Sequence, residues 1–279
     1  MNERIEVTSP LELPDLEKLL VGFLREEIGK AGFARGVVGV SGGLDSAVAL
    51  LLAARALGPE HVLGLLLPYR TSSDDSVRDA RAVIAVAGSP SEEIDISPMV
   101  DAFAAAAGCD EPLRMGNRMA RERMALLYDR AARDRALVVG TSNKTELLLG
   151  YSTRWGDGAY DLNPIGDLYK KQVRALGAHL GVPTAILEKA PSADLWPGQT
   201  DEAELGLSYA DADRILWYLV DQRGRPERAA EELGVAQAAV DRVMRLMTAT
   251  QFKRNLPLIC KVQLRTVGID FRLPRDWGR

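Results

Sequence analysis

The chain has 279 residues, 47% of them hydrophobic, which is enough for one large α/β domain or two small ones. A net charge of −4 gives no global basic field for nucleic acid, so no nucleic-acid partner is expected. Residues 1–20 are charged and broken by prolines, unlike a signal peptide or a membrane span. The two cysteines are far apart and lack CxxC spacing, which favours a reducing cytoplasm over a disulfide framework or a zinc site.

An amphipathic helix is predicted over residues 11–31, where large apolar residues recur at helical spacing. A short apolar strand, Val37–Val40, then leads through a Ser-Gly-Gly turn into a helix that begins near Asp45 and Ser46. Glycines let the backbone approach an anion, and the free N–H groups of a first helical turn point at it. The unit therefore predicts a phosphate site. Its structural alternative is a helix cap made by Asp45 or Ser46.

Apolar runs predict three further strands, at 62–68, 94–96 and 136–140. Helices are predicted between them, at 76–87, 98–107 and 113–134. Alternating strands and helices are typical of an α/β fold, here a doubly wound, mostly parallel sheet flanked by helices. Ligands of such sheets bind outside the carboxyl ends of the strands, so the polar loop 69–75 is expected on the ligand side.

A second strand-to-turn-to-helix junction follows the strand at 136–140 and contains Glu146. If the strands are parallel, Glu146 and Asp45 lie on one rim and can face one metal. Mg²⁺ suits such a pair, because it takes a few carboxylates plus phosphate oxygens. Taken alone, Glu146 is also consistent with an exposed first-turn glutamate favoured by the helix dipole. Lys170 opposes the dipole near the start of a helix predicted at 168–180, and is interpreted as meeting an anion.

The remaining chain is predicted to combine long loops with a helical C-terminal part. The loops are expected at 151–167 and 189–205, and the helices at 208–222, 226–233 and 235–250. The tail through Arg279 is expected to be mostly irregular.

The run SGGLDS after an apolar strand resembles the pyrophosphate loop of the ATP pyrophosphatases, which split ATP between its α and β phosphates and activate a substrate as an adenylate. Residues 140–176 and 187–209 resemble one member of that class, the ammonia-dependent NAD⁺ synthetases, and the likeness extends from about Leu16 to the tail. It implies an adenine nucleotide alpha hydrolase-like, Rossmann-like fold. It also implies a single domain, residues 1–279, with a core at about 15–190 and a helical and tail region at about 200–279.

The resemblance implies amidation of deamido-NAD (nicotinic acid adenine dinucleotide) by ammonia through an acyl-adenylate, giving NAD⁺, AMP and pyrophosphate. ATP is then the co-substrate, Mg²⁺ the cofactor, and a homodimer the assembly, with helices 11–31 and 113–134 as candidate interfaces. We expect no fused amidase domain in 279 residues, and a separate glutaminase partner is left open but not indicated. The alternatives are a GMP synthetase-like or tRNA-modifying pyrophosphatase, and a non-catalytic adenine-nucleotide sensor. The presence of Asp45 and Glu146 counts against the sensor.

The resemblance also implies roles for individual residues that stand at matching positions of the family. The expected catalytic residues are Asp45, Glu146 and Lys170, and the first two are the expected metal ligands. The residues expected to bind ATP are Gly39, Val40, Ser41, Gly42, Gly43, Leu44, Asp45, Ser46, Thr141, Lys170 and Ser192. The residues expected to bind deamido-NAD are Arg121, Arg154, Asp161 and Lys253. Arg154 stands where many relatives have lysine, and Phe252 stands where histidine is common, so no polar role is expected of Phe252.

Overall fold

Four short parallel strands form the centre of the computed structural model, which describes residue 7 and residues 9–192, 194–196 and 198–271. They are β1 (Gly36–Gly39), β2 (Val62–Leu66), β3 (Ser91–Glu93) and β4 (Leu137–Val139), in the order β3-β2-β1-β4. Val38 pairs with Gly64 on one side and with Val139 on the other.

The helices, in chain order, are α1 (Leu13–Lys30), α2 (Leu44–Leu57), α3 (Asp74–Ala87), α4 (Ser97–Ala107), α5 (Pro112–Asp134), α6 (Lys144–Leu149), α7 (Lys170–Leu180), α8 (Thr184–Glu188), α9 (Asp201–Leu205), α10 (Tyr209–Leu216), α11 (Pro226–Leu233), α12 (Gln237–Ala249) and α13 (Gln251–Arg254). A short 3₁₀ turn, Pro59–His61, precedes β2, and a π-helical turn, Trp217–Asp221, follows α10. In the part of the chain that the structure describes, no helix is both long and apolar enough to cross a bilayer.

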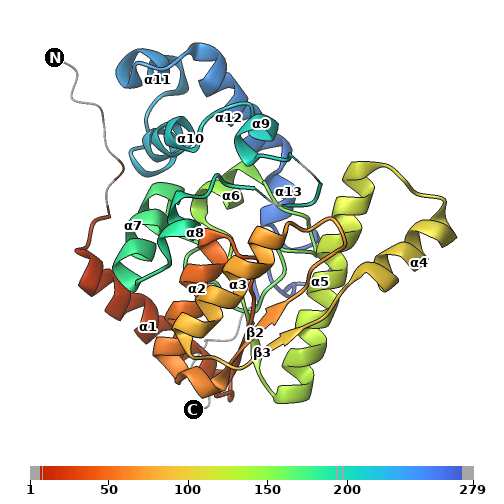
Figure 1. The fold of residues 1–279 in the computed structure, drawn as a ribbon. Helices are drawn as coiled ribbons and strands as arrows, with labels where there is room; N and C mark the ends of the chain where they lie inside the picture. Colours follow the sequence, from red (N-terminus) through yellow and green to blue (C-terminus); the bar gives the residue numbers. More distant parts are fainter. Residues whose placement is uncertain (1–6, 8, 193, 197, 272–279) are drawn as a thin grey trace.

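Helices cover both faces of the sheet, because successive strand residues point to opposite sides. Val38 packs into a cluster with α1, α2, α3 and α7, whereas Val37 packs with α4 and α5 on the other face. Figure 1 shows these two layers on either side of β2 and β3. A third apolar cluster joins α6 to α10, α11 and α12, which form the helical lobe at the top of Figure 1.

The strand order places a topological switch point between β1 and β4. The chain runs outward from β1 through β2 to β3 and then returns to the other side of β1 as β4. In open parallel sheets ligands bind at such a point, outside the carboxyl ends of the strands. Here β1 leads into the phosphate loop and β4 leads into α6, so the two junctions singled out in the sequence flank the switch point.

The predicted parallel sheet flanked by helices is confirmed, but the third strand was placed wrongly. The regular strand is Ser91–Glu93 and not residues 94–96. Pairing does continue, because the N–H groups of Ile94 and Ile96 donate to the carbonyls of Leu66 and Pro68. The apolar signal at Ile96 reflects its complete burial beside α4, whereas the true edge strand is polar.

Smaller departures lie in the second half. The segment 189–205, predicted as loop, ends in the helix α9, and α8 was not predicted. The helix predicted at 208–222 divides into α10 and the π-helical turn. Residues 193 and 197 of that loop and residues 272–279 of the tail lie outside the described residues.

Candidate active site

The phosphate loop has a glycine where no other residue fits. Gly42 has φ of +80°, a left-handed conformation that glycine adopts at little cost. A Cβ atom on Gly42 would also lie 2.1 Å from the carbonyl oxygen of Ser76 in the first turn of α3. Both backbone conformation and space therefore require glycine, and the loop is held close to the N-terminus of α3.

The hydroxyl of Ser46 shapes the loop from within. The N–H of Ser41 donates to Ser46 Oγ at 3.2 Å, and that hydroxyl donates to the carbonyl of Gly43 at 3.0 Å. Among the residues that the structure describes, no side chain caps α2 at its N-cap residue, Gly43. The capping alternative is found only in part, because the Ser46 hydroxyl accepts from a loop N–H, that of Ser41. No side chain of the described residues bonds to the N–H of Leu44 or Asp45, so these first-turn groups of α2 are available to an anion.

Two carboxylates and one ammonium group meet beside this loop. Lys170 Nζ forms ion pairs with Asp45 Oδ2 and, at 3.3 Å, with Glu146 Oε1. The Lys170 side chain is only 7% exposed. The structure thus brings together, from α2, α6 and α7, the three residues predicted to be catalytic. Their roles in catalysis stay a prediction.

Asn143 fixes the two carboxylates relative to each other. Its fully buried side chain donates through Nδ2 to Asp45 Oδ1 at 3.1 Å. Its Oδ1 accepts from the N–H of Glu146 at 3.0 Å, and Glu146 Oε2 accepts in return from the N–H of Asn143 at 3.3 Å. This exchange is a capping box at the start of α6. Our reading of the sequence missed Asn143, although its Asn-x-x-Glu spacing is the local signal of such a box.

A buried pair, Thr145 and Asp213, ties the first residues of α7 to α6 and α10. Thr145 Oγ1 accepts from the N–H of Lys170 at 3.1 Å and donates to Asp213 Oδ1 at 2.5 Å. Asp213 Oδ2 accepts from the N–H of Lys171 at 2.8 Å. Burial raises the pKa of Asp213 above its usual value. The position of Lys170 therefore depends on the helical lobe as well as on the sheet.

Two tyrosines and a further acid line the lobe side of the cluster. Tyr209 places its ring 5.0 Å from Lys170 Nζ, and its hydroxyl lies 3.3 Å from Glu146 Oε1 and 3.1 Å from Asp201 Oδ2. Asp201 also accepts from the hydroxyl of Tyr151 at 3.0 Å. Burial raises the pKa of Asp201 and of Tyr209. No local pattern in the sequence pointed to these residues, because their contacts join distant segments.

Burial sets the protonation of the central pair. Burial and then the charge of Asp45 raise the pKa of Glu146 to about 8. Burial alone would lower the pKa of Lys170, but the charges of Asp45 and Glu146 outweigh it and raise that pKa. Lys170 therefore stays charged, while Glu146 holds a proton unless more positive charge is brought to it.

The donor set fits Mg²⁺ carried with a nucleotide. Within residues 7–271, apart from the few that the structure leaves undescribed, no group of three or more His, Cys, Asp or Glu side chains is arranged to hold a metal by itself. Mg²⁺ commonly takes one or two carboxylates and completes its shell with phosphate oxygens and water. Asp45 and Glu146 offer such a pair at the rim of the phosphate loop, and the cation would favour the ionised form of Glu146.

The other residues predicted to bind ATP lie around this centre. Thr141 follows β4 and is half-buried at the same edge of the sheet. Ser192 is exposed, and its hydroxyl donates to the carbonyl of Gln199 at 2.8 Å. The loop that holds Ser192 is tied to the phosphate-loop side of α3 by Lys189, whose Nζ donates to Ser76 Oγ at 3.1 Å. No contact in the described residues joins Ser192 to the Asp45 cluster.

The residues predicted to bind deamido-NAD form a separate group. Lys253 is turned toward backbone, because its Nζ donates to the carbonyls of Gly150 and Ser152 at 2.7 Å each. Burial lowers the pKa of Lys253. That Lys253 binds the ligand stays a prediction. In the structure it joins α13 to the segment after α6 by these two hydrogen bonds.

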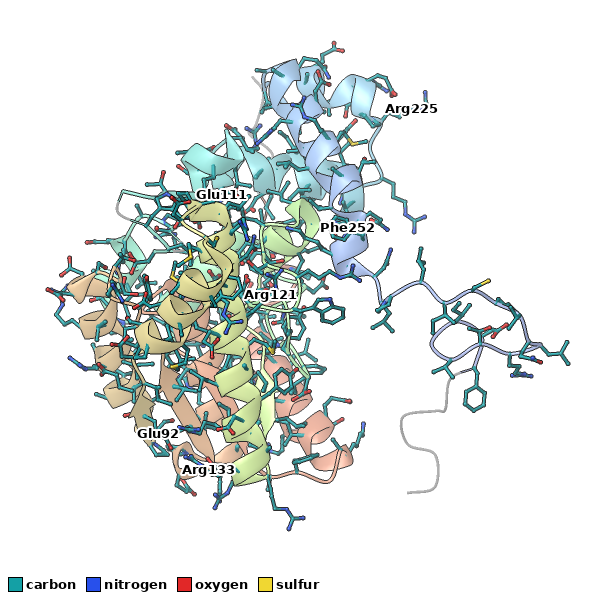
Figure 2. The ribbon with its side chains drawn as sticks, turned by 90° about the vertical axis from the view of Figure 1, so that its right-hand side faces the viewer. Glu92, Glu111, Arg121, Arg133, Arg225 and Phe252 are labelled. Atoms are coloured by element: carbon teal, nitrogen blue, oxygen red, sulfur yellow. The ribbon has the colours of Figure 1, made fainter. Side chains whose placement is uncertain are left out.

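Asp161, Arg121 and Arg154 lie around the same irregular segment. Asp161 Oδ2 accepts from the N–H of Val138 at 2.7 Å, which places this carboxylate along β4. Arg121 is exposed on α5 (Figure 2). The segment passes close to it, since a Cβ on Gly156 would lie 2.9 Å from the Cβ of Ala120. Lys253 reaches the same segment through Ser152, so all four predicted residues border or belong to one loop, without contacts among their side chains in the described part of the chain.

The model of the family described as NAD synthase matches residues 16–257, which include every residue of the site above. A curated protein of Chlorobium phaeobacteroides (strain BS1), named NH(3)-dependent NAD(+) synthetase, is 51% identical over 262 residues, or 94% of each chain.

Two solved structures share the fold at substantial identity. One, from Francisella tularensis, is titled an NMN synthetase and superposes with a TM-score of 0.81 at 34% identity, covering 90% of this chain and 99% of that one. The other, an NH3-dependent NAD synthetase from Campylobacter jejuni, gives 0.78 at 31% identity, covering 90% and 100%. The glycine loop at the switch point, the carboxylate pair beyond it and the extent of these matches lead to one conclusion: the chain belongs to the NAD synthase family of enzymes.

Proposed function

We propose that the chain catalyses the ATP-dependent amidation of deamido-NAD with ammonia, forming NAD⁺, AMP and pyrophosphate. The observation that carries the proposal is the Asp45–Lys170–Glu146 cluster beside an uncapped, glycine-built phosphate loop. Family membership supports ammonia-dependent NAD⁺ synthesis as the activity. The two carboxylates are present and close together, which counts against a nucleotide sensor without catalysis.

The first half-reaction activates a carboxylate. An oxygen of the nicotinate carboxylate attacks the α phosphorus of ATP, the bond from that phosphorus to the bridging oxygen breaks, and pyrophosphate leaves with the electron pair. The N–H groups at the start of α2 would hold the phosphates, and Lys170 would face the same negative charge. When bound at Asp45 and Glu146, Mg²⁺ supplies further charge neutralisation at the phosphates.

The second half-reaction uses the acyl-adenylate. The lone pair of ammonia attacks the acyl carbon, AMP leaves with the electrons of the carbon–oxygen bond, and one proton is released. AMP is a far better leaving group than oxide, which is why adenylation precedes amidation. The chain's own contribution is to hold both substrates in reacting geometry, and we infer that Arg121, Arg154, Asp161 and Lys253 orient the dinucleotide.

We also propose a cytoplasmic homodimer with one functional domain. The site draws residues from the sheet and from the helical lobe, so neither part is complete alone. Both cysteines are free thiols, which suits a reducing compartment. The segment 256–271 leaves the body (Figure 2) and carries apolar side chains whose exposed fractions reach 96% at Leu258 and 93% at Leu264. A second copy of the chain is a natural cover for such a segment.

The proposal is tested by measuring NAD⁺ and AMP formation from ATP, Mg²⁺ and deamido-NAD, with ammonium in one reaction and glutamine in another. We expect equal amounts of NAD⁺ and AMP with ammonium and none with ammonia-free glutamine. NAD⁺ from glutamine at a comparable rate would reveal a glutaminase activity outside the proposal. A folded protein that binds ATP and forms no NAD⁺ in either reaction would overturn it.

A second substrate belongs in the same experiment. Because the Francisella tularensis structure is titled an NMN synthetase, nicotinate mononucleotide should be compared with deamido-NAD. The dinucleotide is expected to give the higher kcat/KM. The reverse ranking would reassign the chain to amidation of the mononucleotide with the same chemistry.

A further inference from the structure

An arginine of the irregular segment after α6 lies over two aromatic rings. The guanidinium carbon of Arg154 lies 5.1 Å from the ring centroid of Trp155 and 5.5 Å from that of Phe252. The two aromatic residues are 51% and 53% exposed. Nη2 of Arg154 also donates to the carbonyl of Asn255 at 3.3 Å. No carboxylate among the described residues pairs with Arg154, so its positive charge is oriented without being neutralised.

The backbone that carries each ring is constrained. Trp155 has φ of +61°, a left-handed conformation that a residue other than glycine rarely adopts. Phe252 lies on α13, which Lys253 fastens to the segment after α6 and Arg254 fastens to α6 itself, through Nη1 and the carbonyl of Leu148 at 2.7 Å. Phe252 therefore has a defined position relative to Arg154, although the two are far apart in the sequence.

Such a stack suits an arginine that has to bind an anion. Aromatic faces attract a guanidinium and fix its plane, which leaves its N–H groups available except for the one that Nη2 donates to Asn255. The remaining N–H groups can then donate two parallel hydrogen bonds to a carboxylate or phosphate, a geometry that an unrestrained side chain has to order at an entropic cost. The loop that carries Arg154 also passes next to the helix turn of Arg121, which is exposed on α5 in Figure 2, so a second cation borders the same region.

We propose that Phe252 is a positioning residue: together with Trp155 it holds the Arg154 guanidinium as a rigid fork for an anionic group of deamido-NAD. This inference rests on the proposed function for the identity of the ligand. It assigns a role to a position where the sequence suggested none, and the role is exerted through Arg154 and not by contact of Phe252 with the reacting atoms.

The test is calorimetric titration of deamido-NAD into the wild type and into three variants, Phe252→Ala, Phe252→Leu and Phe252→Tyr. Leucine keeps apolar bulk but has no aromatic face, whereas tyrosine keeps the face. We expect Kd to rise about three- to tenfold for alanine and leucine and to stay within about twofold for tyrosine. Phe33→Ala, which removes another partly exposed phenylalanine at the opposite, amino-terminal end of β1, should leave Kd unchanged.

A double-mutant cycle separates positioning from packing. If Phe252 acts through Arg154, Phe252→Ala should change Kd by less than about twofold once Arg154→Ala is present. The same factor in both backgrounds, or an unchanged Kd in Phe252→Leu, would overturn the inference. NAD⁺ formation by the wild type is measured in parallel. A wild type that binds deamido-NAD without forming NAD⁺ would refute the proposed function, while the Kd values would still decide the role of Phe252.

Discussion

At the scale of single residues, the site is defined by an imbalance of charge. One ammonium group, on Lys170, stands between the carboxylates of Asp45 and Glu146 in a place that is mostly shielded from water. Two ionised carboxylates cannot both be neutralised by one ammonium group in such a place, so Glu146 keeps a proton until a further cation arrives. The proposed cofactor and the raised pKa of Glu146 are two consequences of the same arrangement.

Replacing Asp45 by asparagine should remove turnover while preserving nucleotide binding. The amide keeps the size of the carboxylate but loses the charge proposed to hold Mg²⁺, so kcat is expected to fall by about 10²–10³-fold. The Kd for ATP without metal should change by less than about threefold. Steady-state kinetics and equilibrium binding check this, with Asp241→Asn on the exposed side of α12 as the control. A fall in kcat of less than tenfold would argue against a metal role for Asp45.

The raised pKa of Glu146 predicts a specific dependence of stability on pH. Between about pH 4.5 and 8 the folded chain holds a proton on Glu146 that the unfolded chain has lost, so its free energy of unfolding falls as pH rises through that window. Glu146→Gln removes this titration. With EDTA present, urea unfolding at about pH 5 and about pH 8 should show a decline in the wild type that exceeds the decline in the variant. Equal declines would contradict the raised pKa.

At the scale of secondary-structure elements, the N-terminus of α7 is the point where sheet and lobe meet. Thr145 from α6 and Asp213 from α10 both bond to it, and both are buried. Polar groups buried in this way stabilise the fold only while every partner is present. The position of Lys170 therefore depends on the Thr145 hydroxyl together with Asp213, which bonds to the next residue of α7.

Thr145→Val should destabilise the chain, because valine has the same shape but leaves Asp213 Oδ1 and the N–H of Lys170 without their partner. The expected loss is about 1–3 kcal/mol for each unsatisfied group. Thr145→Ser retains the hydroxyl and should lose less. Urea unfolding of the three proteins measures the difference. Equal stabilities of the valine and serine variants would mean that this hydroxyl does not join the helices.

Local sequence patterns predicted the strands and the loop that carry the site, but they did not predict the edge strand β3 or the residues that reach the site from the helical lobe. Apolar runs and the glycine turn identified β1, β4 and the loop before α2, because those signals arise within a few residues of chain. Edge strand β3 was displaced because its own residues are polar and the apolar signal belongs to Ile96 beyond it. Tyr209, Asp201 and Asp213 reach the site through contacts between distant helices, and periodicity contains no information about such pairings.

At the scale of the whole molecule, the exposed large apolar side chains are concentrated in one part of the chain. The main body buries its apolar side chains in three clusters, whereas segment 256–271 presents a series of them outside that body (Figure 2). The two helices predicted as dimer interfaces, at residues 11–31 and 113–134, expose fewer large apolar side chains. In α1 most apolar residues face the subunit's own core, although Leu19 and, on α5, Leu113 are more than half exposed.

Light scattering coupled to gel filtration should therefore give a mass of twice the 30.4 kDa of one chain. Replacing Leu258 and Leu264 together by serine should shift the protein toward monomer, because it removes apolar area that only a partner can cover. Val86→Ser, on the exposed side of α3 and outside both the segment and the helices predicted as interfaces, is the matched control. A dimer unchanged by the paired substitution would place the interface elsewhere, with α5 as the next candidate.

The long-range ties of the catalytic cluster also bear on how the chain folds. Asn143 and Lys170 bond to Asp45 across 98 and 125 positions of sequence, whereas the hydrogen bonds within α2 or α6 span a single turn. Closing such long loops has an entropic cost that local structure avoids, so contacts of this separation tend to form late. During refolding, far-ultraviolet circular dichroism should consequently recover before the ability to make NAD⁺, because the catalytic cluster is complete only after these long-range contacts have formed.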